Sequence, residues 1–198
     1  MRRWIPISML LLVFVTSCAI QPDASPKQVP EEQRSILGEP ETGDEAAGSN
    51  TVYLLAPSDP DGSQRLRSVS RDVPAAPGAV LRSLFAGPNE DERDSQLDTA
   101  IPTDLELLSA RSVGQILTVD VVDAFGELTA DGLRFAVAQI VSTASSIEGV
   151  RAVQLRIEGE PRVWPLGNGE LTDRPLTVYD YPGLIESTQP AFPAIPGG

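Results

Sequence analysis

Few side chains in this sequence could carry out covalent or acid–base chemistry. Histidine is absent, the one cysteine is Cys18 and the one lysine is Lys27. A Ser-His or Cys-His pair cannot form without histidine. A Ser-Lys pair or a Schiff base could use only Lys27, so beyond residue 27 the chain lacks the group that these mechanisms need. The sequence also contains no phosphate-binding loop and no G-x-S-x-G nucleophile motif. Only carboxylates remain as candidates for chemistry.

The carboxylates do not form a recognisable catalytic or metal-binding pattern. Asp120 and Asp123 are the best pair for acid–base work, but an offset of three residues in a strand places them on opposite faces. The motif DPDG at 59–62 has the composition of a calcium loop without its spaced ligands and distal glutamate, so a turn is predicted. We therefore predict no catalytic residue, no metal ligand and no cofactor, and we expect that the protein is not an enzyme.

Cys18 has a different chemical role. Two arginines precede an apolar stretch over residues 4–15, which is too short for the roughly 20 residues of a membrane-spanning helix. The following Val-Thr-Ser-Cys at 15–18 resembles the bacterial lipobox, which implies cleavage of a signal peptide over residues 1–17 and acylation of Cys18. The chain would then be lipid-anchored at the extracytoplasmic face of the cell membrane. The alternatives are an ordinary signal peptide that contains a cysteine, or an uncleaved anchor.

Charge and composition divide the remaining chain into a tether, a domain and a tail. Without residues 1–17 the formal charge is 13 − 28 = −15, which disfavours nucleic acid as a partner. Residues 18–50 are acidic and rich in proline, so they are predicted to be a lipidated cysteine followed by a disordered tether. Residues 51–185 are predicted to form one domain, and residues 186–198 a flexible proline-rich tail.

The domain shows strand and helix patterns in the order β-β-α-β-β-α-β. Strands are predicted at 51–56, 65–73, 105–113, 116–122 and 151–159, and helices at 77–86 and 129–148, with a short strand and turn at 162–171. The second helix carries an apolar stripe at helical spacing. This order predicts an α+β fold in which two helices pack on one face of a mixed β-sheet. The stripe consists of Leu133, Ala136, Val137, Ile140, Val141, Ala144 and Ile147.

Several segments in combination resemble the GerMN domain, a sporulation and spore germination module of bacterial envelope proteins that are often lipoproteins. These segments are VSRDV (69–73), LRSLFAGP (81–88), LDTAIP (97–102), ILTVDVVDAF (116–125) and FAVAQIVSTASSIEGVRAVQLRIEG (135–159). The resemblance covers about 135 residues and one copy of the module. It implies a non-catalytic domain whose fold is similar to small α/β modules that build rings in sporulation secretion complexes.

Four residues are candidates for a partner surface: Arg71, Trp164, Tyr179 and Tyr181. Arg71 could instead form an ion pair, for example with Asp72 or Asp120. The three aromatic residues could instead cover the open edge of the sheet. Phe85 and Phe125 are predicted to belong to the core.

These observations predict a lipid-anchored binding or scaffolding module of the bacterial cell envelope. Its partners would be membrane lipid, through acylated Cys18, and an envelope protein that adds a strand to an open edge at 151–157 or in the segment 164–171. Two alternatives stay open. One is a small-solute-binding lipoprotein with a deep apolar pocket. The other is a cell-wall hydrolase with two carboxyl groups roughly 5 to 9.5 Å apart.

Overall fold

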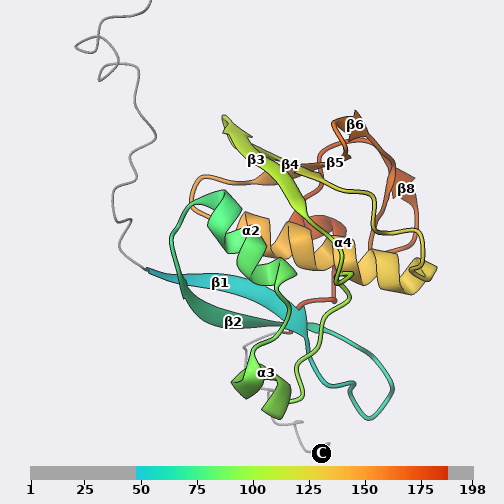
Figure 1. Cartoon of the computed structure of the whole chain (residues 1–198). Coiled ribbons are helices and arrows are strands. Elements are labelled where there is room, and N and C mark those ends of the chain that lie inside the picture. The colour runs from blue at the N-terminus through green and yellow to red at the C-terminus, as the bar shows by residue number, and fades with distance from the viewer. Residues whose placement is uncertain (1–47, 187–198) are drawn as a thin grey trace, which may run out of the picture. The chain divides into compact units, whose positions relative to one another are not determined.

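A computed structural model describes residues 48–186 of the chain (Figure 1). The predictions for the signal peptide, Cys18, the tether up to residue 47 and the tail from residue 187 lie outside the described residues. Within residues 48–186 no helix is long and apolar enough to cross a membrane. The elements are β1 (Gly48–Leu55), β2 (Leu66–Val73), α2 (Pro77–Phe85), α3 (Glu90–Asp94), β3 (Leu107–Val113), β4 (Ile116–Val121), α4 (Ala130–Ser145), β5 (Ala152–Ile157), β6 (Glu160–Pro161), β7 (Trp164–Pro165), β8 (Leu171–Thr172) and the 3₁₀ helix η2 (Val178–Asp180).

The first two strands form an antiparallel hairpin. Their register runs from Gly48 opposite Val73 to Leu55 opposite Leu66. Val52 and Leu54 are fully buried, as alternate residues on the covered face of a strand must be. The connecting segment contains the predicted turn at 59–62, which a backbone hydrogen bond closes at 2.8 Å from the N–H of residue 62 to the carbonyl of residue 59.

The second sheet is mixed and has the strand order β3-β4-β5-β6. β3 pairs antiparallel with β4, and Gly114 takes up the positive φ of +60° at their tight turn. β4 and β5 are parallel, with α4 as the crossover between them. The predicted alternation of both strands is confirmed, because their inward-facing side chains are all buried. These side chains are Leu117, Val119, Val121, Val153, Leu155 and Ile157.

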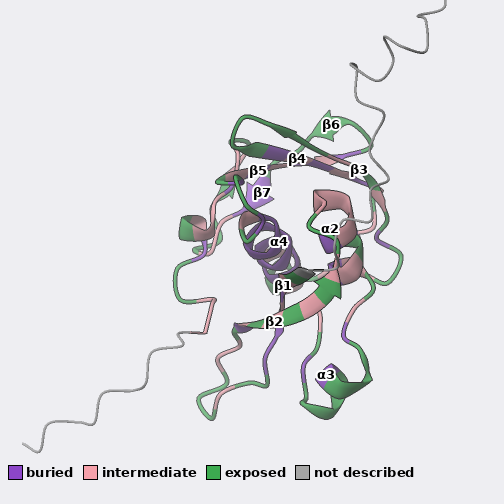
Figure 2. Cartoon of the chain, turned by 90° about the vertical axis from the view of Figure 1, so that its left-hand side faces the viewer, coloured by how far each residue is buried: buried purple, intermediate pink, exposed green. Residues whose placement is uncertain are grey.

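Helices α2 and α4 lie between the two sheets (Figure 1). In the perpendicular view of Figure 2, α4 is mostly buried and has the mixed sheet on one side and the β1–β2 hairpin on the other. Both helices therefore cover the same face of the mixed sheet, which confirms the predicted α+β class. The sequence did not indicate that the first hairpin would form a separate sheet on the opposite side of the helices.

This position explains why α4 is buried over more of its surface than its apolar stripe predicts. Every residue from Phe135 to Ala144 is buried, including the polar Gln139, Ser142 and Thr143. A helix that contacts a single sheet needs only one apolar face, whereas α4 contacts two sheets. Gln139 and Thr143 face the hairpin, and their hydrogen bonds to it are described below.

Local signals set the helix ends. Pro77 occupies the first turn of α2, and Gly87, at φ +72°, follows its end. The hydroxyl of Thr129 accepts a hydrogen bond of 3.1 Å from the N–H of Gly132 and caps α4. The strand predicted at 151–159 is shorter in the structure, where Arg151 lies just before β5.

Candidate functional site

Arg71 is a structural residue and not part of an exposed surface. Its guanidinium forms an ion pair with Glu92, in which Nε donates to Oε1 at 3.0 Å, and the exposed fractions of the two side chains are 12% and 9%. Arg71 also donates to the backbone carbonyls of Ser83 and Gly87, the latter at 2.8 Å. It thereby connects β2, the end of α2 and the start of α3. The predicted ion pair exists, but its partner is neither Asp72 nor Asp120.

Two of the three candidate aromatic residues are also buried. Trp164 is 3% exposed, and its Nε1 donates to the carbonyl of Leu155 at 2.9 Å. Its ring packs edge-to-face against Phe125, with 5.4 Å between the ring centroids. Tyr181 is 1% exposed and its hydroxyl donates to the carbonyl of Pro165 at 2.9 Å. Burial raises the pKa of Tyr181. Trp164 thus covers the edge of β5, as in the alternative interpretation, and Tyr181 is buried against the segment around Pro165.

Tyr179 is the exception, because it is 87% exposed. The other three candidates are buried or nearly so. The four residues therefore do not form one exposed surface in this structure. Phe125 is buried and Phe85 packs partly buried against the core, as predicted.

The candidate carboxylates are engaged in separate structural contacts. Asp120 accepts a hydrogen bond of 2.8 Å from the N–H of Gly159, and Asp123 lies 3.9 Å from Arg162. No group of three or more acidic or cysteine side chains in the described part of the chain could hold a metal ion. The DPDG carboxylates also have local partners: the pKa of Asp61 is lowered by a hydrogen bond from the Ser63 hydroxyl.

The edge of β1 is closed by polar side chains of α4. Thr143 accepts a hydrogen bond of 3.0 Å from the N–H of Tyr53, and Gln139 donates to the Tyr53 carbonyl at 2.9 Å. Ser146 donates to the carbonyl of Thr51 at 2.9 Å. Sequence reasoning missed this function of α4. The available signal was the spacing of Gln139, Thr143 and the C-cap Ser146 at i, i+4 and i+7, which places them on one face of the helix.

The edge of β5 is closed as well, which corrects the predicted docking position at 151–157. Val153 and Leu176 exchange two backbone hydrogen bonds of 2.8 Å each. The last residues of β5 pair with β6, and the indole of Trp164 binds the Leu155 carbonyl between them. The chain itself therefore occupies most of the edge of β5 that a partner strand would need.

The edge of β3 is different, because β3 is the terminal strand of the mixed sheet and has β4 as its only strand neighbour within residues 48–186. Two aliphatic side chains on this strand are exposed, Leu108 at 50% and Val113 at 72%. A register shift between Leu107 and Ser109 marks a bulge at Leu108. A surface groove of about 380 Å³ opens beside the first residue of β3, between this strand and α2. It is lined by Arg82, Phe85, Ala86, Leu105, Glu106 and Leu107.

We call this region the β3 flank and define it by Arg82, Leu108, Arg111 and Val113 together with the groove. Arg82 and Arg111 form no ion pair with any residue in 48–186. The sequence alone provides no clear signal for the flank, because no residue of β3 is buried and its apolar residues do not alternate strictly. The arginines of the described residues that do form an ion pair are Arg65, Arg67, Arg71, Arg134, Arg162 and Arg174.

Comparison with known proteins gives both a family and a fold. The family model described as "Germane: Sporulation and spore germination" matches residues 51–163. The solved tandem GerMN domains of the sporulation protein GerM from Bacillus subtilis have a TM-score of 0.53 and 19% identity. The match covers 72% of this chain and 48% of that structure, so this chain spans about half of it.

A putative lipoprotein from Clostridium perfringens matches with a TM-score of 0.46 and 16% identity over 70% of this chain and 93% of that one. No curated protein sequence matches the chain. At 19% identity the tandem GerMN structure supports the fold alone.

Proposed function

We propose a function from one premise, which is that the chain belongs to the Germane family of sporulation and spore germination domains. On this premise we propose that it is a lipid-anchored module at the extracytoplasmic face of a bacterial membrane. It acts by binding an envelope protein and not by catalysis. The observation that carries this proposal is that the candidate catalytic groups have structural partners, whereas the edge strand β3 has β4 as its only strand neighbour within residues 48–186.

The proposed absence of catalysis is supported by the isolation of the carboxylates. Each of three surface cavities is lined by a single carboxylate, namely Asp131, Glu106 or Asp180. Asp131 is 2.9 Å from Arg134, and hydrogen bonding to Arg174 lowers the pKa of Asp180. A general acid needs a raised pKa, and a glycosidase needs two facing carboxyl groups. This arrangement disfavours the hydrolase alternative.

The solute-binding alternative would need a suitable cavity, and the candidate is one of about 630 Å³ at the start of α4. Such sites are usually lined mainly by apolar and aromatic side chains. This cavity is instead lined largely by loop residues and by Arg65, Asp131 and Arg134. Arg65 lies 3.3 Å from Asp59, and Arg134 pairs with Asp131, so both cations already have partners. We therefore favour protein binding over solute binding.

The proposed anchor rests on the Val-Thr-Ser-Cys motif at 15–18. Each buried acyl CH₂ contributes ~0.8 kcal/mol, so two chains on Cys18 would hold the protein stably at the bilayer. The Cys18→Ser variant of the full chain should leave the membrane fraction or keep its signal peptide. Mass spectrometry and fractionation measure this, and an unchanged mass and location would contradict the anchor.

Binding without catalysis needs a separate test. The full chain would be expressed in its host, its membranes solubilised in mild detergent, and the size of its assembly measured on native gels. We expect an assembly larger than the 21.1 kDa chain, and we expect Asp120→Asn and Asp123→Asn to preserve it. A wild-type chain that migrates alone would contradict the proposal. A carboxylate variant that folds normally but loses the cellular phenotype would instead favour an enzyme.

A further inference from the structure

We infer that the β3 flank binds an extended, acidic and aliphatic segment of a partner protein, which adds as a strand to the edge of β3. This inference rests on the proposed function, because it names the surface and the partner chemistry of a binding module. Strand addition uses the unpaired backbone N–H and C=O groups of an edge strand for affinity and side-chain pockets for specificity.

The backbone limits where strand addition can occur. The edge of β1 is closed by α4, and the edge of β5 is closed by Leu176 and β6. Leu66 at the start of β2 pairs with the chain around Ile185. Apart from the two-residue strands β6, β7 and β8, two open stretches remain in the described part of the chain, the rest of β2 and β3. The bulge at Leu108 leaves five regular residues on β3, from Ser109 to Val113, so the added segment is short.

Side-chain chemistry distinguishes these two stretches. The open part of β2 presents the polar Ser68, Ser70 and Asp72, all of them exposed. A charged residue on an edge strand is a common protection against unwanted pairing, and Asp72 would repel an acidic segment, which Arg111 would attract. β3 instead presents Leu108 and Val113, and the groove beside it is lined by Phe85 and Leu105 and can take an aliphatic side chain of the partner. β3 is thus the edge whose side chains can stabilise an added partner strand.

Charge identifies the partner as acidic. The chain carries a formal charge of −13, yet Arg82 and Arg111 remain without an ion pair among the described residues. Carboxylates of an added segment would pair with these guanidinium groups, because Arg binds carboxylates in a bidentate geometry. Glu106 lines the same groove as Arg82 and offsets part of its charge, whereas Arg111 is the only charged residue of β3. The acidic residues of the partner therefore belong above all opposite Arg111.

The same charges disfavour a second copy of this chain as the occupant. Two β3 edges paired antiparallel would bring the arginines of both copies to one interface. Arg111 is the only charged residue of β3, so the strand offers no carboxylate to balance this repulsion. Complementary charge across an interface is what selects a partner, and β3 is complementary to an acidic strand and not to itself.

A defined peptide tests the inference. The probe is a fluorescein-labelled peptide of eight residues that alternates glutamate and valine, titrated with the full chain in detergent and followed by fluorescence anisotropy. We expect Arg111→Glu to weaken binding ~10-fold or more, since it replaces attraction by repulsion. Arg93→Glu is the matched control, because Arg93 is an exposed arginine on α3, well away from β3 in Figures 1 and 2, and should change binding less than ~2-fold.

Two further peptides separate main-chain pairing from simple charge attraction. A version with N-methylated alternate amides keeps its charge but cannot complete a strand ladder, so it should bind ~10-fold more weakly. A version with lysine in place of glutamate should bind the Arg111→Glu variant better than the wild type.

Several results would overturn the inference. Equal effects of Arg111→Glu and Arg93→Glu, or equal binding of the methylated peptide, would do so. Preferential capture of phosphatidylglycerol vesicles would assign the flank to lipid, and self-association that depends on Arg111 would assign it to a second copy. If the peptide fails to bind while the native assembly persists, the inference fails and the proposed function stands. If the peptide binds and no assembly exists in membranes, the proposed function fails instead.

Discussion

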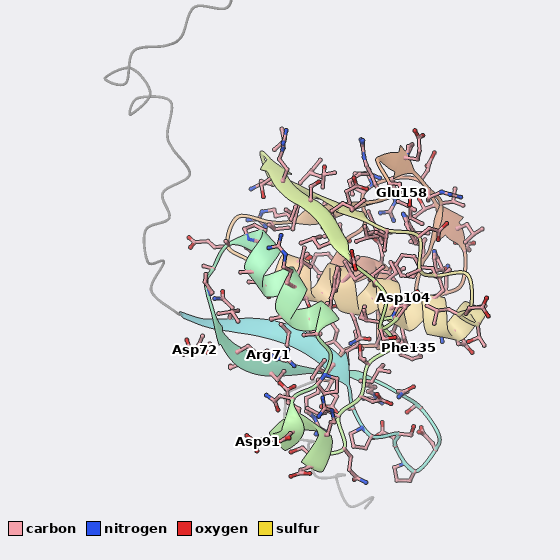
Figure 3. The ribbon with its side chains drawn as sticks, in the orientation of Figure 1. Arg71, Asp72, Asp91, Asp104, Phe135 and Glu158 are labelled. Carbon is pink, nitrogen blue, oxygen red and sulfur yellow. The ribbon has the colours of Figure 1, made fainter. Side chains whose placement is uncertain are left out.

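Arg71 and Glu92 form a nearly buried ion pair that joins the first sheet to the short helix α3, across 21 residues of sequence. Glu92 is also the third residue of the α3 capping box, in which it accepts a hydrogen bond of 2.7 Å from the N–H of Asn89. One carboxylate thus satisfies both a buried cation and a helix terminus. In Figure 3, Arg71 lies within the fold, while the neighbouring Asp72 and Asp91 lie at its outside.

Removal of one partner of this pair should be far more damaging than removal of both. We expect Glu92→Ala to lower the free energy of unfolding by about 3–5 kcal/mol, because it leaves a buried guanidinium without its counter-charge. The double variant Arg71→Met with Glu92→Leu should recover much of this loss. Denaturant unfolding of the purified chain measures both. Asp91→Ala, on the exposed side of α3, is the control and should change stability by less than about 0.5 kcal/mol. Equal losses in the single and double variants would show that the ion pair is not the cause.

The sequence predicted those parts of the fold that depend on local periodicity. The buried faces of β4 and β5 follow from strict alternation, and α4 follows from its apolar stripe. The position of the hairpin does not follow, because nothing in the pattern of β1 or β2 distinguishes pairing within one sheet from packing across two helices. The same limit applies to the site. Trp164 and Tyr181 have the composition of a contact surface, and only the chain path around β5 shows that they are covered.

The β3 flank could not be predicted from the sequence either. Leu108 and Val113 are exposed on a strand that has no buried residue, and the sequence pattern does not mark them. The meaning of their exposure depends on strand order, because an exposed leucine on an internal strand has no free backbone groups beside it. The identification of β3 as the terminal strand requires the parallel pairing of β4 with β5, which is a long-range contact.

Two adjacent hydroxyl residues of α4 should respond oppositely to the loss of their hydroxyl group. Thr143→Val keeps the shape of the side chain but leaves the buried N–H of Tyr53 without its acceptor, so we expect a loss of about 1–3 kcal/mol. Ser142→Ala removes a buried hydroxyl for which the described residues provide no hydrogen-bond partner, and it should be neutral or stabilising. Thermal and denaturant unfolding of the two variants provide the comparison. A Thr143→Val protein as stable as the wild type would mean that α4 does not close the edge of β1.

Gly167 should not tolerate any side chain. A Cβ atom at this position would lie 2.9 Å from the backbone oxygen of Asp180 and 3.0 Å from Cα of Tyr181, and neither backbone atom can rotate away. We expect Gly167→Ala to cost about 1–3 kcal/mol through overpacking. Gly126→Ala is the matched control, since a Cβ there meets nothing within 4 Å. It should be neutral, and similar losses in both variants would show that the contact with Asp180 and Tyr181 is not the reason.

The pair of Arg174 and Asp180 should contribute to the acid limb of the stability curve. The Arg174 guanidinium, with Nη1 at 3.0 Å from Oδ2, lowers the pKa of Asp180 below its ordinary value of 3.8, and hydrogen bonds from Thr177 act in the same direction. A carboxyl group whose pKa is lower in the folded state stabilises the protein above the unfolded pKa, and this contribution is lost as pH falls through the folded pKa. The stability difference between wild type and Asp180→Asn should therefore stay constant from pH 7 to about pH 5 and shrink below about pH 4. Denaturant unfolding across this range measures the difference, with Asp173→Asn as the neighbouring exposed control. A difference that is unchanged at low pH would show that the charge of Asp180 does not stabilise the fold.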